Sequence, residues 1–112
     1  MIDCVFCKIA NKKIPANIVY EDDKVIAFKD VEPKFPIHLL IVPKKHVSSV
    51  NHLESGDKEL IGDLVLIAQK IAKEQNVSGS GYRLSFNVGK DAGQTIYHLH
   101  LHLMGGEKLP FA

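Results

Sequence analysis

Hydrophobic residues recur at helical spacing in one long stretch of the chain, residues 57–76. Apolar positions three and four apart predict a single long helix there, because they fall on one side of a turn of about 3.6 residues. A shorter segment, residues 3–12, predicts a second helix that ends before Pro15 and has Phe6 and Ile9 on one side. The long helix is expected to bury two adjacent stripes: Leu60, Leu64, Ile67 and Ile71, and beside them Ile61, Val65, Ala68 and Ala72.

Runs of β-prone residues account for most of the other apolar positions and predict five strands. Residues 18–20 and 25–28 flank a polar turn, which is typical of a hairpin. The other three runs are residues 38–42, 82–87 and 97–103. Short loops between neighbouring strands favour antiparallel pairing. The predicted fold class is therefore α+β, a five-stranded antiparallel sheet with one long helix and a short N-terminal helix.

Length and composition are typical of one globular domain over residues 1–112, with 46% apolar and 24% charged residues. A net charge of +1 gives no strong electrostatic footprint, so we expect neither a nucleic acid nor a membrane partner. The sequence contains no signal-peptide pattern and no apolar run near the roughly 18 residues of a membrane helix. We therefore expect a cytoplasmic protein. Because so small a chain gains from burying a further face, a second copy is an expected partner.

The two cysteines, Cys4 and Cys7, stand at C-x-x-C spacing near the start of the chain. In a reducing compartment they are not expected to form a structural disulfide. The spacing fits either a redox pair or half of a zinc site.

Three of the six histidines, His98, His100 and His102, alternate with leucines in residues 97–103. On a strand, alternate side chains share a face, so the three rings are expected on one side at steps of roughly 7 Å. Folding alone does not call for three titratable rings in a row. A neutral imidazole is a good nucleophile toward phosphorus near pH 7, and a neighbouring ring can donate to the phosphoryl oxygens.

The loop from Gly89 to Thr95 leads directly into this histidine run. Its backbone N–H groups could hold an anion, and the Thr95 hydroxyl could meet a leaving group. The pattern thus favours a site that acts on a phosphate ester or amide, with His100 as the nucleophile.

Residues 96–106 resemble the signature of the histidine triad (HIT) family, in which three histidines alternate with apolar residues. The resemblance covers nearly the whole chain and is nearest to the purine nucleoside phosphoramidase (Hint-like) branch. It implies one HIT domain that dimerises through its long helix and a strand edge. The other matching blocks are residues 30–33, 36–46, 81–83 and 87–95.

The resemblance implies a mechanism and a set of site residues. His100 would attack the α-phosphorus of a nucleoside 5′-monophosphate derivative, an amine would leave, and water would release an AMP- or GMP-type product from nucleotidyl-histidine. His102 would bind phosphate oxygens, His38 would orient the nucleophile network, and Asp30 would accept hydrogen bonds from the ribose hydroxyls. The phosphate and leaving group would meet Asn87, Gly93, Gln94 and Thr95, and the base would meet Phe6, Ile9, Phe28 and Val31.

Structural alternatives stay open for several of these residues. Asp30 is also a good turn residue, Asn87 could only tie its loop, and Phe28 and Ile9 could only be core residues. The sequence departs from the family pattern at Thr95, where serine is usual, and at Lys29, where a histidine can occur.

The resemblance also extends to a metal site made of Cys4, Cys7, His46 and His98. Four protein ligands leave no open position, so such a zinc ion would be structural; two free thiols are the alternative. Two other functions remain possible from sequence. His98, His100 and another histidine could bind a catalytic zinc with an open position, or the protein could be a purine-nucleotide-binding regulatory module.

Overall fold

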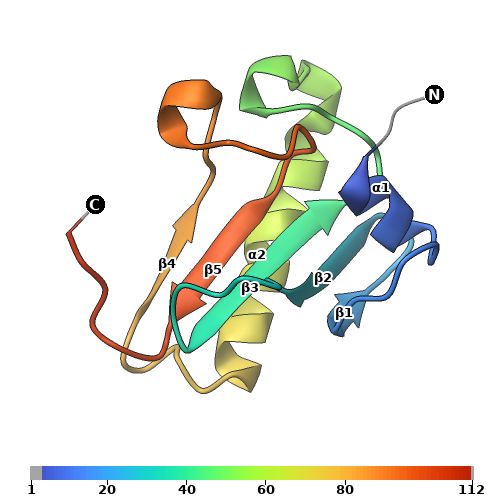
Figure 1. Cartoon of the computed structure of the whole chain (residues 1–112). Helices are drawn as coiled ribbons and strands as arrows, with labels where there is room; N and C mark the ends of the chain where they lie inside the picture. Colours follow the sequence, from blue (N-terminus) through green and yellow to red (C-terminus); the bar gives the residue numbers. More distant parts are fainter. Residues whose placement is uncertain (1–3, 112) are drawn as a thin grey trace.

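A five-stranded antiparallel sheet organises residues 4–111, the part of the chain that the computed structural model describes (Figure 1). Its strands lie in the order β1-β2-β3-β5-β4, so the last strand enters between two earlier ones. The predicted fold class is confirmed. The strand bounds are β1 Ile18–Glu21, β2 Val25–Lys29, β3 Ile37–Pro43, β4 Tyr82–Ser85 and β5 Leu101–Gly105.

The long helix α2 (Lys58–Glu74) covers one face of the sheet (Figure 1). Its Leu64 and Ile71 are fully buried and belong to the same apolar cluster as Leu39 of β3 and Leu101 of β5. The predicted second stripe is too wide, because Val65 is 43% exposed on the outer side of the helix. Among residues 4–111, no helix is both long and apolar enough to cross a bilayer.

The opposite face of the sheet is covered near β2 and β3 by the short helix α1 (Val5–Ala10). Phe6 and Ile9 of this helix pack with Ile26, Phe28 and Leu40 of the strands. Neighbouring residues of β2 and β3 point to opposite faces of the sheet, and both faces are covered there. Both strands are therefore almost continuously buried. The helix is shorter than the predicted residues 3–12, and Asp3 lies outside the described residues.

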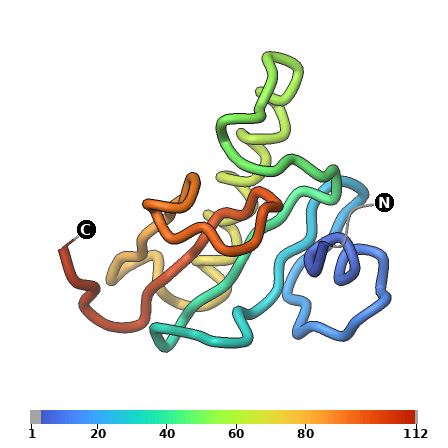
Figure 2. The backbone as a smooth tube through the Cα atoms, turned by 45° about the horizontal axis from the view of Figure 1, so that its top comes forward, coloured from blue at the N-terminus to red at the C-terminus, as the bar shows by residue number. Residues whose placement is uncertain are grey.

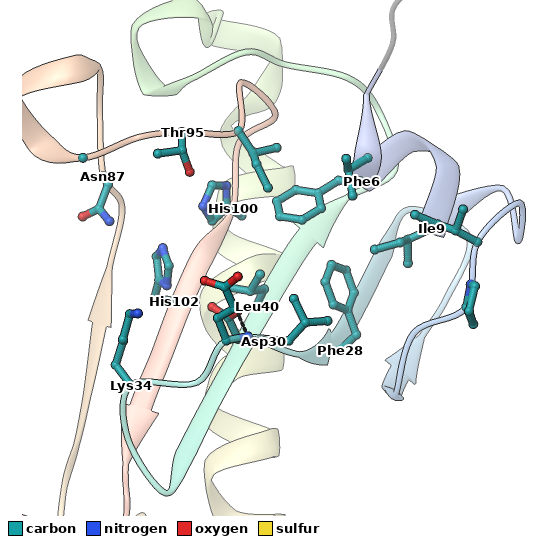
Figure 3. A pocket seen from close by; sticks show the side chains of 17 residues that line it. Phe6, Ile9, Phe28, Asp30, Lys34, Leu40, Asn87, Thr95, His100 and His102 are labelled. Atoms are coloured by element: carbon teal, nitrogen blue, oxygen red, sulfur yellow. Dashed lines mark hydrogen bonds between the residues drawn. The ribbon is translucent and has the colours of Figure 1, made fainter.

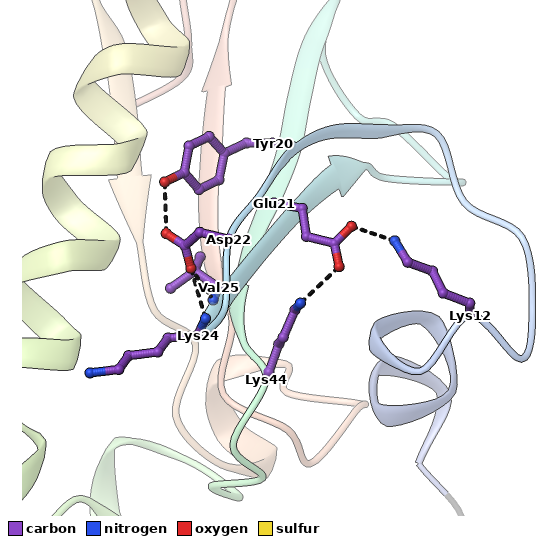
Figure 4. Close-up of polar contacts among 7 residues, drawn as sticks. All are labelled: Lys12, Tyr20, Glu21, Asp22, Lys24, Val25 and Lys44. Atoms are coloured by element: carbon purple, nitrogen blue, oxygen red, sulfur yellow. Dashed lines mark hydrogen bonds and ion pairs between the residues drawn. The ribbon is translucent and has the colours of Figure 1, made fainter.

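The β1–β2 hairpin is held by one aspartate in its turn (Figure 4). The Asp22 carboxylate accepts hydrogen bonds from the backbone N–H groups of Lys24 and Val25, each at 2.8 Å, and from the Tyr20 hydroxyl at 2.7 Å. This is the local side-chain-to-backbone bonding that makes aspartate a turn residue. Beside the turn, Glu21 pairs with Lys12 and Lys44, which ties the segment after α1 to the hairpin.

The last strand begins later than predicted, at Leu101 rather than at residue 97. In the register of β3 and β5, Leu101 pairs with Ile41, and the residues before Leu101 leave the ladder although β3 continues to Pro43. They run beside the segment that follows β3, where the Leu99 N–H donates to the Val47 carbonyl at 2.6 Å (Figure 2). The alternation nevertheless persists, because Leu99, Leu101 and Leu103 are all buried in the cluster with α2.

Candidate active site

A cleft of about 420 Å³ opens on the face of the sheet opposite α2 (Figure 3). α1, the loop between β2 and β3, and the segments on either side of η3 (Lys90–Ala92) form its walls. The residues that line it are Val5, Phe6, Ile9, Ile14, Pro15, Phe28, Asp30, Val31, Glu32, Lys34, Leu40, Asn87, Gly93, Thr95, Ile96, His100 and His102.

One end of the cleft is an apolar slot. Phe6 and Phe28 meet edge to face with their ring centroids 5.4 Å apart, and Ile9 lies beside them (Figure 3). All three are buried in the apolar cluster under α1, so they are core residues and cleft residues at once. Val31 is 88% exposed and stands at the rim. A flat aromatic base fits a slot of this composition.

The backbone fixes the orientation of the His100 ring. Its Nδ1 lies 2.7 Å from the His98 carbonyl oxygen, so Nδ1 carries the proton and donates it. The lone pair is then on Nε2, on a ring that lines the cleft. The Phe6 ring packs against the imidazole with centroids 5.1 Å apart. Burial lowers the pKa of His100, which keeps the ring neutral and nucleophilic near pH 7.

His38 and His102 form a hydrogen-bonded pair with assignable protons. The backbone N–H of Lys34 donates to His38 Nδ1 at 3.0 Å, so the His38 proton is on Nε2. That Nε2 lies 3.1 Å from His102 Nδ1 and 3.5 Å from Asp30 Oδ2. Because His102 Nδ1 accepts, the His102 proton is on Nε2, where it can be donated to a ligand.

Burial keeps these two rings neutral as well. It lowers the pKa of His102 to about 4, with the neighbouring His100 and His38 acting in the same direction. It also lowers the pKa of His38, against the attraction of Asp30. His38 is buried behind His102 and does not itself line the cleft. Its geometry therefore suits the predicted role of orienting another ring.

Asp30 divides its two oxygens between the turn and the cleft. Oδ1 accepts the Glu32 N–H at 2.9 Å, as a turn residue would, whereas Oδ2 faces His38. The side chain lines the cleft midway between the apolar slot and the histidines (Figure 3). The two interpretations from sequence are thus compatible in one residue.

Asn87, Gly93 and Thr95 line the cleft, but Gln94 does not. Gln94 is only 5% exposed, and its amide is occupied by backbone partners. Oε1 accepts the Gly89 N–H at 2.9 Å, while Nε2 donates to the carbonyls of Ser48 and Ile96 at 2.8 and 3.2 Å. The Gln94 side chain therefore holds the loop, and its predicted contact with the phosphate stays a prediction.

Next to the cleft, Cys4, Cys7, His46 and His98 direct four donor atoms at one point. His98 is fully buried, and its Nε2 donates to the Pro43 carbonyl at 2.7 Å, so the lone pair of Nδ1 faces the other three. From Nδ1 the distances are 3.2 Å to Cys4 Sγ, 3.5 Å to Cys7 Sγ and 3.2 Å to His46 Nδ1. Zinc bonds of 2.0–2.3 Å in a tetrahedron require donor separations of about 3.3–3.8 Å, so this set fits the ion closely.

A second group of possible ligands, Asp30, His38 and His102, is better explained by hydrogen bonds. The proton on His38 Nε2 points at the centre of the group, where a cation needs a lone pair. His98 and His100 also direct their Nδ1 atoms to different partners. His98 Nδ1 faces His46 and the two cysteines, whereas His100 Nδ1 faces the His98 carbonyl. The geometry therefore gives no support to a catalytic metal bound by His98 and His100.

The sequence did not indicate several lining residues, among them Leu40, Ile96 and Lys34. Lys34 stands four residues before His38 in the loop between β2 and β3. Its position between Pro33 and Pro36 indicates a loop of restricted conformation, which was the sequence feature that could have drawn attention to this residue.

Comparison with known proteins finds similar sequences and similar folds over nearly the whole chain. Residues 3–110 match the family described as "Scavenger mRNA decapping enzyme C-term binding". A HIT-like protein of Buchnera aphidicola is 45% identical over 105 residues, which are 94% of this chain and 92% of that protein. A HIT family hydrolase from Legionella pneumophila has a TM-score of 0.96 at 46% identity, with 97% of each chain covered. A histidine triad protein from Clostridium difficile has a TM-score of 0.96 at 44% identity, covering 100% of this chain and 97% of that one.

Proposed function

This chain belongs to the histidine triad (HIT) family, and we propose that it hydrolyses nucleoside 5′-monophosphate derivatives as a purine nucleoside phosphoramidase. One observation carries the proposal: His100 presents an unprotonated Nε2 in the cleft, with the N–H of His102 beside it. The two ring centroids are 4.9 Å apart, so one phosphoryl group can contact both rings. The Legionella relative is itself called a hydrolase.

In the first step, His100 Nε2 forms a bond to the α-phosphorus as the bond from phosphorus to the amine nitrogen breaks. The departing nitrogen takes up a proton from solvent water, and the Thr95 hydroxyl is proposed to relay it. The positive charge on the imidazole is delocalised toward Nδ1, whose proton already bonds to the His98 carbonyl. His102 Nε2–H donates to a phosphoryl oxygen and offsets the charge that develops there.

In the second step, water attacks the same phosphorus, the bond to His100 Nε2 breaks, and the attacking water releases a proton to solvent, which balances the proton taken up by the amine. The nucleoside monophosphate leaves, and the imidazole returns to its neutral form. Asp30 Oδ2 would accept from the ribose hydroxyls, and Asn87, Gly93 and Thr95 would surround the phosphate. The base would lie in the slot of Phe6, Ile9 and Phe28, with Val31 at its rim.

We further propose that Cys4, Cys7, His46 and His98 hold a structural zinc ion. The four donors lie within 4.8 Å of one another, at separations that suit a tetrahedral ion. With four protein ligands there is no open position, so the ion supplies a cross-link and no chemistry. That link would join α1 to the residues after β3 and to the segment that carries His100.

A homodimer is the proposed assembly. Val65 and Leu66 are 43% and 63% exposed at successive positions of α2, so they form apolar surface on the outer side of this helix. β4 is an edge strand with one sheet partner, so its other side is open to pairing. Both features suit contact with a second copy.

The decisive experiment replaces the nucleophile and leaves the cleft intact. His100→Ala is expected to abolish hydrolysis of adenosine 5′-phosphoramidate and to keep AMP affinity within about tenfold, because a nucleophile contributes mainly in the transition state. The control is His52→Ala, since His52 is exposed, bonds the Ser49 hydroxyl through its ring and does not line the cleft. Mass spectrometry of the wild type after rapid quenching should detect a nucleotidyl adduct that the His100 variant lacks. Full activity of that variant would rule out the mechanism.

A further inference from the structure

The formal charges around the cleft are unevenly distributed. Asp30 and Glu32 both line it and are acidic, whereas Lys34 is the one lysine or arginine among the described lining residues. An anionic substrate entering this cleft meets two carboxylates. The neutral histidine His102 can offer it an N–H but no charge, since burial lowers its pKa to about 4.

The position of Lys34 suits a phosphate better than a base or a sugar. Figure 3 shows its side chain rising from the loop with the ammonium directed toward His102, at the far end of the cleft from Phe6 and Ile9. Within residues 4–111, no carboxylate lies within ion-pair distance of this ammonium. It is therefore available to a ligand.

The backbone of Lys34 is fixed although its side chain is exposed. Its N–H donates to His38 Nδ1 at 3.0 Å, and His38 in turn contacts His102 at 3.1 Å. The turn before it is held by the bond from Glu32 N–H to Asp30 Oδ1. The ammonium thus extends from an anchored point, which limits the entropy lost when it pairs with a ligand.

We propose that Lys34 is a specificity-determining residue that recognises the negative charge of the phosphoryl group, its ammonium pairing with a non-bridging oxygen beside His102. This inference rests on the proposed function and adds to it the group that selects anionic nucleotides over neutral nucleosides. A monophosphate is close to a dianion at neutral pH, so a single ammonium near it offsets the repulsion of Asp30 and Glu32.

The test compares AMP with adenosine, which differ only in the charged group. Calorimetric titration of Lys34→Gln is expected to show AMP bound about five- to tenfold more weakly than by the wild type, with adenosine affinity changed less than twofold. Lys34→Arg should keep AMP affinity within about threefold, because the charge is retained. Lys73→Gln, which makes the same change of charge on the exposed side of α2, is the control and should alter neither ligand.

The outcomes separate this inference from the function on which it rests. Equal AMP binding by Lys34→Gln and the wild type would overturn the role of Lys34 and leave the nucleotide site standing. An equal loss for AMP and adenosine would also overturn it, because the effect would then be on the nucleoside pocket. A wild type that binds neither ligand would overturn the proposed function itself.

Discussion

At the scale of single residues, backbone groups decide which nitrogen of each histidine carries its proton. The carbonyls of His98 and Pro43 accept hydrogen bonds from His100 Nδ1 and His98 Nε2, and the Lys34 N–H donates to His38 Nδ1. In each ring, therefore, one nitrogen forms a hydrogen bond with the backbone, and the other nitrogen is left to interact with side chains or a ligand. The surroundings differ between neighbours in sequence: His98 Nδ1 faces the cysteine sulfurs, whereas the His100 ring lines the cleft.

The depressed pKa of His102 makes a prediction about stability at low pH. Folding lowers this pKa from 6.5 to about 4, so between these values the unfolded chain binds a proton that the folded chain does not. The stability contributed by the neutral ring is present above pH 6.5 and is lost as the pH falls toward 4. Urea unfolding should therefore show a larger fall in free energy from pH 7.5 to pH 5 for the wild type than for His102→Gln.

The expected difference between the two proteins is about 1 kcal/mol, after allowance for the partial exposure of the ring. The proposed metal ligands are the same in both proteins, so their own protonation cancels in the comparison. An identical fall with pH in wild type and variant would contradict the neutral state assigned to His102.

At the scale of secondary-structure elements, the alternation of residues predicted which side chains are buried better than it predicted where a strand begins. Leu99, Leu101 and Leu103 lie in the core as expected, because burial depends only on the period of two. The start of β5 could not be predicted, because its pairing with β3 stops at Ile41, two residues before β3 ends, and alternation in the sequence does not show where pairing stops. The predicted burial of Val65 was wrong for a related reason. The sequence of a helix does not show how far the sheet extends across it, so an apolar residue at the margin can be exposed.

In the candidate site, too, some residues could be predicted from the sequence and others depend on the tertiary structure. His98, His100 and His102 could be proposed from their spacing and side-chain chemistry, whereas His38 and Asp30 were proposed from the resemblance to the HIT family. The role of Gln94 depends on how its loop folds back to Ser48, and the position of Lys34 depends on the turn held by Asp30. The type of these two residues did not place either side chain, since both positions depend on non-local or loop geometry.

The α1 helix provides a prediction about metal removal. A helix of six residues is too short to be stable alone, so α1 depends on its apolar contacts and on Cys4 and Cys7. Protein purified without chelator should contain about one zinc per chain. Cys7→Ser should lower the zinc content and reduce the melting temperature by more than about 4 °C.

Elemental analysis and calorimetry measure these two effects, and Ser80→Ala in the loop before β4 provides an exposed control. Because the proposed zinc is structural, turnover should survive a chelator at temperatures where the fold survives. Protein purified without chelator that contains no zinc would remove the metal from the proposal.

At the scale of the whole molecule, a chain of 112 residues leaves apolar surface uncovered. The sheet is buried on both sides of its centre, by α2 on one face and by α1 on the other. Among the described residues, the exposed large apolar side chains include Val65 and Leu66 on the outer side of α2, and β1 and β4 each have one strand edge without a partner. Burying α2 and an edge strand together would add a contact surface that one chain cannot provide.

We therefore expect sedimentation of the wild type at twice the chain mass of 12.4 kDa. Leu66→Glu should convert the dimer to a folded monomer, because the charge would be buried at the centre of the proposed contact without a partner. The matched control is Ile18→Glu, which places the same charge on an apolar residue that is 37% exposed on β1, the other edge of the sheet. That variant should remain dimeric. A wild type that sediments as a monomer, or a dimer lost equally in both variants, would show that α2 does not form the interface.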